Sequence, residues 1–411
     1  MEFGLLGEHL RHSFSKQIHE SISGVSYELK EVAREELDAF MRAKEFHGIN
    51  VTIPYKEAVI PYLAELSPLA QKVGAVNTIV NDNGRLIGHN TDVLGFLAQL
   101  KHMNLPVEGK TVAILGDGGA SKAVKVALEE AKAKTVFVVS RKNAPNTISY
   151  EELCLHDEIQ VIVNATSVGM FPHNEDALID LTRFPALEGY VDLIYNPWRT
   201  KMVLQAQKKD IKAEGGLYML VAQAVKASEL FLGRAYNPEV IEKEYRRILS
   251  KTRNIVLIGM PTSGKSTVGR ALAKELDLPF LDLDEEIVKK IQMPITDYFA
   301  AHGEPAFRDV ESQVINEIYS CFPFVIATGG GAILRQENVD HLKQNGRLYF
   351  LDRDLENLTL SDDRPLSKNQ KNLQNLYETR YPIYLRHADV VIPNNGAKED
   401  AVKQIIQGEQ R

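Results

Sequence analysis

The residue spacing with the clearest chemistry is a glycine-rich loop, Gly259-Met-Pro-Thr-Ser-Gly-Lys-Ser-Thr267, which directly follows the apolar run Ile255–Ile258. The pattern G-x-x-x-x-G-K-[ST] lets the backbone curl so that its N–H groups point at phosphate oxygens. Lys265 would reach the β- and γ-phosphates of a nucleotide, and Ser266 would offer its hydroxyl to Mg²⁺. Residues 268–276 have helical periodicity, so the phosphates would lie at a helix N-terminus, where the helix dipole favours anions.

Two aspartates follow this loop in the segment 279–284, which has the pattern of a short strand. Asp282 and Asp284 stand two residues apart, and this period would place both carboxylates on one face of a strand. Because a phosphate loop precedes them, we expect Asp282 near the metal and Asp284 near the hydroxyl that accepts a phosphoryl group.

A second glycine-rich turn, Gly116-Asp-Gly-Gly-Ala120, lies between a buried-strand pattern at 111–115 and a helical pattern at 122–132. This is the Rossmann arrangement for a dinucleotide pyrophosphate, although the third glycine of the full fingerprint is missing. The next strand pattern ends in Ser140-Arg141-Lys142. An acidic residue there would hold the ribose 2′-OH of NAD, whereas cations suit a 2′-phosphate, so the local charge favours NADPH. The alternative, that both cations only solvate a loop, stays open.

The elements that must position these residues have an α/β pattern. The first hundred residues alternate apolar runs at 3–7, 27–32 and 49–54 with helical patterns such as 35–44. Asn83-Gly84 between two apolar runs predicts a tight hairpin. Polar clusters interrupt the pattern at 13–15, 50–56, 74–77 and 90–92, and element ends of this kind gather ligands in open α/β sheets.

The composition is that of a soluble globular protein, with 44% hydrophobic and 25% charged residues among 411, a length typical of about two to three domains. The net charge of −7 argues against nucleic acid or an anionic membrane as a partner. We see no apolar run of about 20 residues and no signal peptide. The two cysteines stand far apart, which is typical of free thiols, so a cytoplasmic protein is expected.

Residues 1 to about 233 resemble shikimate dehydrogenase, and residues from about 253 onward resemble shikimate kinase. The first resemblance rests on the segments 13–15, 50–56, 74–78, 90–92, 116–120, 164–170, 192–197 and 215–223, which follow the order of that family. The second rests on the phosphate loop and on the segments 279–284, 303–311, 325–331, 362–366 and 379–384. The resemblance implies NADPH-dependent reduction of 3-dehydroshikimate to shikimate, followed by Mg-ATP-dependent phosphorylation of shikimate to shikimate 3-phosphate.

The chemistry of the first reaction agrees with this resemblance. Hydride transfer to a ketone leaves a developing alkoxide, which needs a proton donor within hydrogen-bond reach. Lys56 is the candidate donor and Asp92 its orienting partner; the alternative is a surface lysine and a helix N-cap aspartate. The resemblance implies that shikimate is bound by Ser13, Ser15, Thr52, Asn77, Tyr195 and Gln223. It implies that the cofactor is bound by Gly116, Asp117, Gly118, Gly119, Ala120, Ser140, Arg141, Lys142, Leu193 and Gly216. Asp117 stands where the family more often has alanine, and its charge would weaken cofactor binding unless the side chain points away.

For the second reaction, the resemblance implies Lys265 and Asp284 as catalytic residues and Ser266 and Asp282 as Mg²⁺ ligands. ATP would be bound by Ser263, Gly264, Lys265, Ser266, Thr267 and Arg364, the last as a lid arginine that excludes water. Shikimate would be bound by Asp284, Arg308, Gly329, Gly330, Gly331 and Arg380. The two arginines have the forked geometry that holds a carboxylate at two points.

We therefore predict an α/β protein of three domains and a linker. A substrate-binding domain covers 1–101 with a return at about 217–236, a Rossmann domain 102–216, a helical linker 237–252, and a P-loop domain of the nucleoside-monophosphate-kinase type 253–411. Three alternatives remain: a dehydrogenase whose P-loop domain only binds ATP as a regulatory module, an NAD-dependent oxidiser of quinate or shikimate, and a non-catalytic scaffold.

Overall fold

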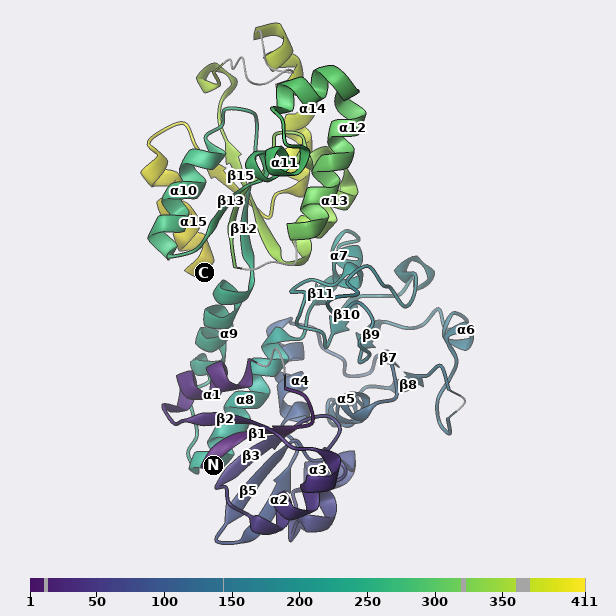
Figure 1. Cartoon of the computed structure of the whole chain (residues 1–411). Helices are drawn as coiled ribbons and strands as arrows, with labels where there is room; N and C mark the ends of the chain where they lie inside the picture. Colours follow the sequence, from purple (N-terminus) through teal and green to yellow (C-terminus); the bar gives the residue numbers. More distant parts are fainter. Residues whose placement is uncertain (11–13, 143, 319–322, 360–369, 411) are drawn as a thin grey trace. The chain divides into compact units, whose positions relative to one another are not determined.

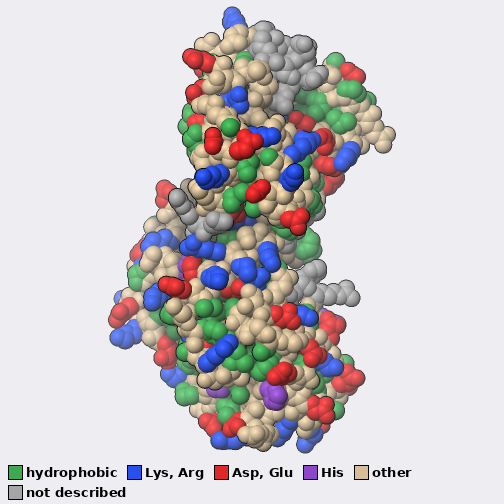
Figure 2. All heavy atoms as spheres, turned by 90° about the vertical axis from the view of Figure 1, so that its left-hand side faces the viewer, with side chains coloured by type: hydrophobic (Ala, Val, Ile, Leu, Met, Phe, Trp, Pro, Cys, Tyr) green, Lys and Arg blue, Asp and Glu red, His purple; other side chains and the backbone are tan. Residues whose placement is uncertain are grey.

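The computed structural model describes residues 1–10, 14–142, 144–318, 323–359 and 370–410. These residues form two units (Figure 1). The first comprises Met1–Tyr195 and Thr200–Ile248, and the second Asn196–Arg199 and Leu249–Arg411. Over the described ranges, no helix combines the length and the apolar character that crossing a membrane requires. Acidic and basic side chains are interspersed on the face drawn in Figure 2.

The first unit begins with a six-stranded sheet of order β2-β1-β3-β5-β6-β4. Its strands are β1 (Phe3–Gly7), β2 (Tyr27–Glu31), β3 (Gly48–Val51), β4 (Glu65–Leu66), β5 (Thr78–Asp82) and β6 (Arg85–His89), and its helices are α1 (Ser15–Ser23), α2 (Leu37–Ala43) and α3 (Pro68–Val73). The hairpin between β5 and β6 is confirmed: both strands are antiparallel, and Asn83 and Gly84 take the positive φ of 51° and 89° that a two-residue turn requires.

A second sheet of the first unit has five parallel strands in the order β11-β10-β9-β7-β8. The strands are β7 (Thr111–Leu115), β8 (Thr135–Val139), β9 (Val161–Asn164), β10 (Gly189–Asp192) and β11 (Lys212–Glu214), and the helices are α5 (Gly119–Glu130), α6 (Tyr150–Leu153) and α7 (Lys201–Gln207). Leu115 pairs with both Val139 and Asn164, so the carboxyl ends of three strands meet at one edge. This edge carries the glycine turn.

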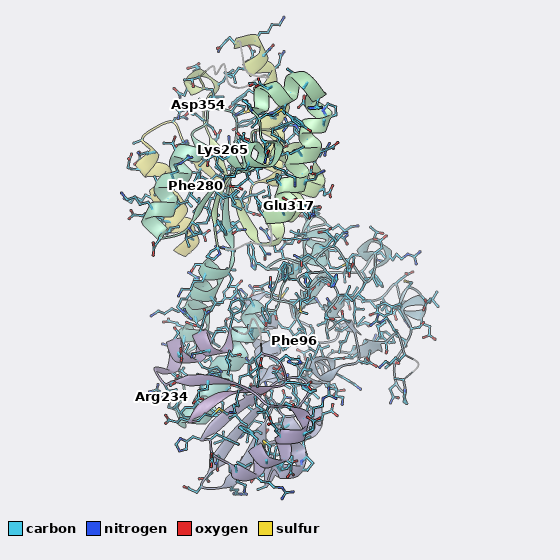
Figure 3. The ribbon with its side chains drawn as sticks, viewed as in Figure 1. Phe96, Arg234, Lys265, Phe280, Glu317 and Asp354 are labelled. Carbon is cyan, nitrogen blue, oxygen red and sulfur yellow. The ribbon has the colours of Figure 1, made fainter. Side chains whose placement is uncertain are left out.

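Three further helices complete the framework: α4 (Asp92–His102), α8 (Leu217–Leu232) and α9 (Glu239–Thr252). Helices α4 and α8 are the most extensively paired helices of the first unit. Phe96 of α4, labelled in Figure 3, is fully buried in the core that joins α4 to α5 and the second sheet. Because Asp92 opens α4 and Gln223 lies on α8, this packing fixes the backbone from which both side chains extend.

The second unit has a parallel sheet of order β13-β14-β12-β15-β16. Its strands are β12 (Asn254–Ile258), β13 (Phe280–Asp282), β14 (Val325–Ala327), β15 (Gly346–Asp352) and β16 (Val390–Pro393), and its helices are α10 (Lys265–Leu276), α11 (Leu283–Ile291), α12 (Ile295–Ile318), α13 (Gln336–Gln344), α14 (Gln370–His387) and α15 (Lys398–Gln410). The central strand β12 is wholly buried and leads into the phosphate loop. The α/β fold class is thus confirmed for both units.

The strand predicted over 279–284 is partly wrong. The strand ends at Asp282, and Asp284 lies in the first turn of α11. The Asp282 carboxylate accepts a hydrogen bond from the Asp284 backbone N–H at 3.1 Å and so caps the helix. The two carboxylates are neighbours because of this cap, not because they share the face of a strand.

Four residues that precede α7, Asn196–Arg199, group with the second unit. Within that unit, both terminal nitrogens of Arg199 donate to Asp389 at 3.0 Å, and its Nη2 also donates to the Gly346 carbonyl at 2.7 Å. Burial would raise the pKa of Asp389, but the Arg199 guanidinium holds it below its ordinary value. The ring of Trp198 lies under two guanidinium groups, those of Arg199 and Arg253.

Candidate active sites

The first candidate site is centred on an ion pair. Lys56 Nζ donates to Asp92 Oδ2 at 2.7 Å, and both side chains are mostly buried, at 20% and 13% exposure. The other carboxylate oxygen of Asp92 accepts from Asn77 Nδ2 at 2.9 Å. This arrangement holds an ammonium group in a defined orientation, as proton transfer to a bound oxygen requires.

The orientation of the Asn77 amide is set from behind the site. Its Oδ1 accepts from the Thr91 backbone N–H at 2.7 Å and from the Thr78 hydroxyl at 3.1 Å, so Nδ2 must face Asp92. Thr78 in turn accepts from Asn50 Nδ2 at 3.0 Å, and Asn50 Oδ1 accepts from the Tyr27 hydroxyl at 2.7 Å. A buried chain of hydrogen bonds therefore runs from β2 to the ion pair.

A cavity of about 380 Å³ surrounds this ion pair, a size suited to a small ligand. Its lining contains Lys56, Asp92 and five of the predicted shikimate ligands: Ser15, Thr52, Asn77, Tyr195 and Gln223. Three of the predicted cofactor residues, Ala120, Leu193 and Gly216, line the same cavity. The structure thus brings the two predicted sets together. Ser13 lies outside the described residues.

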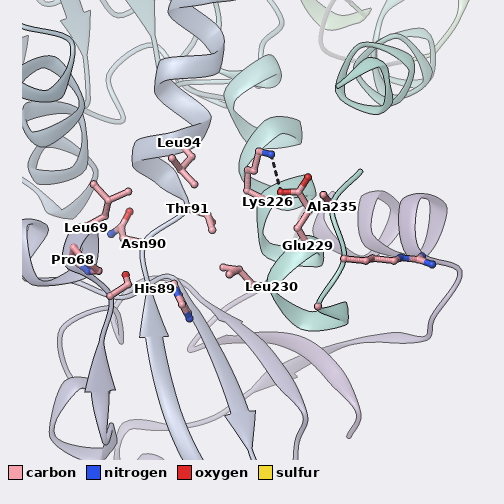
Figure 4. Close-up of a pocket in the computed structure, with 13 residues that line it drawn as sticks. Pro68, Leu69, His89, Asn90, Thr91, Leu94, Lys226, Glu229, Leu230 and Ala235 are labelled. Carbon is pink, nitrogen blue, oxygen red and sulfur yellow. Dashed lines mark hydrogen bonds and ion pairs between the residues drawn. The ribbon is translucent and has the colours of Figure 1, made fainter. Parts of the chain in front are cut away.

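Sequence reasoning did not assign several residues of this cavity, among them His9, Asn50 and Met219. Asn50 and Thr91 stand inside the motifs that carried the resemblance, and this position was the available signal. Their roles depend on partners distant in the sequence, such as Tyr27 for Asn50 and Gln223 for Thr91, which no local pattern reveals. A second pocket, of about 470 Å³, lies between the start of α4 and the carboxyl-terminal half of α8, and Asn90 and Thr91 are among its lining residues (Figure 4).

The glycine turn has the geometry of a pyrophosphate cradle. Gly116 has φ +103°, which favours glycine, and a side chain on Gly118 or Gly119 would meet no atom within 4 Å. This open space lies at the N-terminus of α5, where backbone N–H groups favour an anion. The residues present therefore fit a dinucleotide. Ser140 is buried at the end of β8, whereas Arg141 and Lys142 are exposed.

The segment after β10 closes the cofactor side of the cavity. A Cβ on Gly216 would lie 2.3 Å from the Leu193 carbonyl oxygen, so only glycine allows this approach. The buried Asp192 carboxylate organises the segment, because it accepts from Asn164 Nδ2, the Ile194 N–H and the Thr200 hydroxyl at 2.8–3.1 Å. Burial raises the pKa of Asp192 to about 6, although these donors oppose it.

The second candidate site is built on the phosphate loop. Gly259 and Gly264 have φ of 153° and 90°, as the curled backbone requires. Lys265, labelled in Figure 3, opens α10, and its Nζ donates to the carbonyls of Gly259 and Met260 at 3.0 and 2.8 Å. The Ser266 hydroxyl donates to Asp282 Oδ2 at 2.6 Å, so the two predicted Mg²⁺ ligands are adjacent.

The predicted acceptor residues of this site also converge. A Cβ on Gly329 would lie 2.9 Å from Asp284 Oδ1, and one on Gly331 would lie 2.2 Å from the Arg308 guanidinium. Arg380 Nη1 donates to the Gly330 carbonyl at 3.0 Å. Asp284, both arginines and the three glycines therefore surround one place. Arg364, the predicted lid arginine, lies outside the described residues.

Two glutamates that sequence reasoning quoted but did not assign hold Arg308. Glu311 accepts from Nη1 at 2.7 Å and is almost fully buried, and Glu304 accepts from Nη2 at 3.0 Å. Burial raises the pKa of Glu311, opposed by Arg308. This pair fixes the guanidinium beside Gly331.

No cluster of three or more His, Cys, Asp or Glu side chains suited to a metal ion occurs in the described part of the chain. Mg²⁺ in nucleotide enzymes takes one or two protein ligands and completes its shell with water and phosphate oxygens. One hydroxyl, of Ser266, and one carboxylate, of Asp282, form such a set.

Comparisons with known proteins find relatives for both parts of the chain. The family described as shikimate dehydrogenase substrate binding domain matches residues 5–79, and the family described as shikimate kinase matches residues 261–408. A shikimate dehydrogenase (NADP(+)) of Caldanaerobacter subterraneus is 36% identical over 269 residues, which cover 59% of this chain and 96% of that protein. One of Carboxydothermus hydrogenoformans is 38% identical over 264 residues, 58% of this chain and 94% of that protein.

Solved structures give the same result for the first part of the chain. A chorismate mutase/shikimate 5-dehydrogenase fusion protein from Clostridium acetobutylicum matches with a TM-score of 0.56 and 35% identity, over 60% of this chain and 96% of that one. The Thermus thermophilus shikimate 5-dehydrogenase in complex with NADP(H) and shikimate matches with a TM-score of 0.55 and 34% identity, over 60% and 99%. The protein therefore belongs to the shikimate dehydrogenase family and carries a shikimate kinase domain on the same chain.

Proposed function

We propose that this protein catalyses two consecutive reactions of the shikimate pathway: NADPH-dependent reduction of 3-dehydroshikimate to shikimate, and Mg-ATP-dependent phosphorylation of shikimate to shikimate 3-phosphate. The observation that carries the first reaction is the Lys56–Asp92 pair inside a cavity that also contains the predicted shikimate ligands and reaches the glycine turn. The second rests on the phosphate loop, whose Ser266 meets Asp282 while Asp284 faces Gly329.

In the first site, the residues of the chain bind shikimate, orient it and move one proton. The hydroxyls of Ser15 and Thr52 and the amide of Gln223 suit a polyhydroxylated acid. Lys56 Nζ would donate a proton to the carbonyl oxygen as negative charge develops there, and Asp92 would hold the ammonium group in line. The glycine turn, Gly216 and Arg141 would hold the nicotinamide cofactor, which supplies the hydride when bound.

In the second site, catalysis depends on position and charge. Lys265 would neutralise developing charge on the transferred phosphoryl group, and Asp284 would accept the hydrogen bond of the attacking hydroxyl. Arg308 and Arg380 would hold the carboxylate of shikimate at two points, with the backbone of Gly329–Gly331 beside it. Ser266 and Asp282 would hold Mg²⁺, which would supply positive charge to offset that of the phosphates.

We also propose the domain division predicted from the sequence, with a substrate-binding domain at 1–101 and about 217–236, a Rossmann domain at 102–216, a linker at 237–252 and a kinase domain at 253–411. The proposed ligands are small molecules only: two shikimate-pathway acids, NADP(H), ATP and Mg²⁺. We place the protein in the cytoplasm, where NADPH and ATP are supplied; the free thiol of Cys154 is consistent with that compartment.

Two assays on the intact chain test this proposal separately. Shikimate and NADP⁺ should yield NADPH and 3-dehydroshikimate, measured by NADPH absorbance. Shikimate and Mg-ATP should yield ADP and shikimate 3-phosphate, measured by mass spectrometry. ATP binding by calorimetry without phosphoryl transfer would instead identify the P-loop domain as a regulatory module and refute the second half of the proposal.

A further inference from the structure

Asp117 places a carboxylate at the end of the second strand of the nucleotide-binding sheet. The side chain is exposed and belongs to the glycine turn after β7, but its Oδ2 accepts from the Ser140 hydroxyl at 3.0 Å. Ser140 Oγ is itself fixed, because it accepts from the Lys142 backbone N–H at 3.1 Å. The strand register explains why Asp117 can contact Ser140. Leu115 of β7 pairs with Val139 of β8, so the residues that follow the two strands lie side by side.

This location matters for cofactor choice. In dinucleotide-binding folds, an acidic residue at the end of the second strand accepts the ribose 2′-OH of NAD. Here β8 is followed by Ser140, Arg141 and Lys142 and contributes no acid. Asp117 supplies the missing carboxylate from the neighbouring turn. In the described part of the chain its second oxygen, Oδ1, has no hydrogen-bond partner, so it is available to accept from a hydroxyl.

The same carboxylate opposes a 2′-phosphate. Arg141 and Lys142 are exposed beside it and suit that phosphate, yet across the described ranges neither forms an ion pair with Asp117. Both charges act on the half-buried Tyr150. Burial raises the pKa of this tyrosine; Arg141 lowers the pKa and Asp117 raises it. A dianionic group bound near these residues would be attracted by Arg141 and repelled by Asp117.

We propose that Asp117 is the residue that sets the cofactor specificity of the dehydrogenase. It accepts the 2′-OH of NAD(H) and repels the 2′-phosphate of NADP(H), so that this chain accepts both cofactors with a narrow preference, and Arg141 provides the opposing attraction for NADP(H). This inference rests on the proposed function, because it assumes that the glycine turn binds a nicotinamide dinucleotide.

Calorimetric titration of the intact protein with NADP⁺ and with NAD⁺ tests the proposal without any turnover. For Asp117→Ala, the Kd for NADP⁺ should fall roughly tenfold while the Kd for NAD⁺ stays or rises, so that the ratio of the two shifts by about tenfold or more, the order expected for one nearby charge. Arg141→Gln should shift the ratio in the opposite direction. Both side chains are exposed, so neither variant is expected to disturb folding.

Asp157→Asn is the matched control. It also removes an exposed carboxylate from the same unit, but Asp157 precedes β9 and so lies at the amino edge of the sheet, opposite the glycine turn. Its two Kd values should equal those of the unchanged protein. If Asp117→Ala alters both Kd values equally, or neither, the specificity role is refuted although dinucleotide binding stands. If the unchanged protein binds neither cofactor, the proposed function of the first site fails, and this inference fails with it.

Discussion

At the scale of single residues, the first site depends on how one ammonium group is held. Lys56 donates to the Asp92 carboxylate at 2.7 Å, and the second oxygen of that carboxylate accepts from Asn77. Asp92 can therefore orient the lysine without rotating. The Asn77 amide is in turn oriented by the Thr91 N–H, so the geometry of the pair is built into the junction of β6 and α4.

Lys56→Met should lower kcat of the dehydrogenase by about 10²–10⁴, the usual contribution of a positioned proton donor, with a much smaller effect on KM. Steady-state kinetics with 3-dehydroshikimate and NADPH measure this directly. Asp92→Asn keeps the shape but removes the charge, and its loss should be smaller than that of Lys56→Met. A decrease below about threefold for Lys56→Met would show that the proton comes from elsewhere.

In the second site, substitutions of Asp282 and Asp284 should change the dependence of the kinase rate on Mg²⁺ concentration in different ways. Asp284→Asn is expected to lower kinase kcat by about 10²-fold or more at any Mg²⁺ concentration, because the carboxylate that faces the attacking hydroxyl is lost. Asp282→Asn should chiefly raise the Mg²⁺ concentration needed for half-maximal rate, because Ser266 loses its neighbouring carboxylate. Kinase rates across a magnesium titration distinguish the two. Identical behaviour of both variants would contradict the assigned roles.

At the scale of elements, α1, β2 and α8 meet around a buried histidine. His19 of α1 stacks on Tyr27 of β2 at 4.2 Å between ring centroids, and its Nδ1 lies 2.8 Å from the Ser228 hydroxyl of α8. Burial lowers the pKa of His19 from 6.5 to about 3. The folded protein therefore keeps this imidazole neutral at pH values where an unfolded chain would protonate it.

This difference predicts acid sensitivity of the first unit. The unfolded chain binds the proton near pH 6.5 and the folded chain only near pH 3, so stability is complete above about pH 6.5 and falls as the pH falls through this window. Between pH 7 and 5.5 His19 should account for about 1 kcal/mol of lost unfolding free energy. Denaturant titrations, following the transition that NADP⁺ shifts, should show that loss in the unchanged protein but not in His19→Asn. Equal pH slopes for both proteins would contradict it.

In the second unit, Arg199 and Asp389 form a buried pair from segments 190 residues apart. Arg199→Met should lower the unfolding free energy of this unit by about 3 kcal/mol, because it leaves a carboxylate buried without its main partner. Trp198 is the single tryptophan of the chain and belongs to this unit, so its fluorescence reports the transition. The exposed Arg386→Met serves as control, with a change within about 0.5 kcal/mol. Equal effects of both substitutions on the unfolding free energy would show that the Arg199–Asp389 pair does not stabilise this unit.

Elements with strong local signals were predicted closely from the sequence. The strands predicted at 3–7 and 111–115 end where the structure ends them, because each is an apolar run bounded by turn residues. The helix after the phosphate loop starts three residues earlier than its apolar periodicity suggested, since Lys265 already follows a glycine with positive φ. The predicted strand over 279–284 extends too far for a related reason. Asp282 caps α11, but the alternation of apolar and acidic residues continues past it and looks like a strand.

The residues that sequence reasoning missed depend on distant partners. Asn50 gains its role from Tyr27 and Thr78, Glu311 from Arg308, and Arg199 from Asp389. None of these pairings follows from periodicity or local charge, because the fold brings the partners together. Motif spacing indicated the two glycine-rich turns, the family resemblance supplied most of the other candidate site residues, and their catalytic roles stay predictions.

At the scale of the whole molecule, the two proposed reactions follow each other chemically. Reduction of 3-dehydroshikimate creates the hydroxyl that the kinase would phosphorylate, so one chain would carry two consecutive steps. Neither unit shares a sheet with the other, and each has its own glycine-rich turn and its own set of candidate catalytic side chains. Loss of one activity by substitution should therefore leave the other unit folded and active.

The most direct test is one incubation of the intact protein with 3-dehydroshikimate, NADPH and Mg-ATP, with products identified by mass spectrometry over time. The account predicts that shikimate appears first and shikimate 3-phosphate follows. It also predicts that Lys56→Met forms both products at least about 10²-fold more slowly unless shikimate is added, and that Asp284→Asn accumulates shikimate. Formation of shikimate without any phosphate ester by the unchanged protein would contradict the bifunctional assignment.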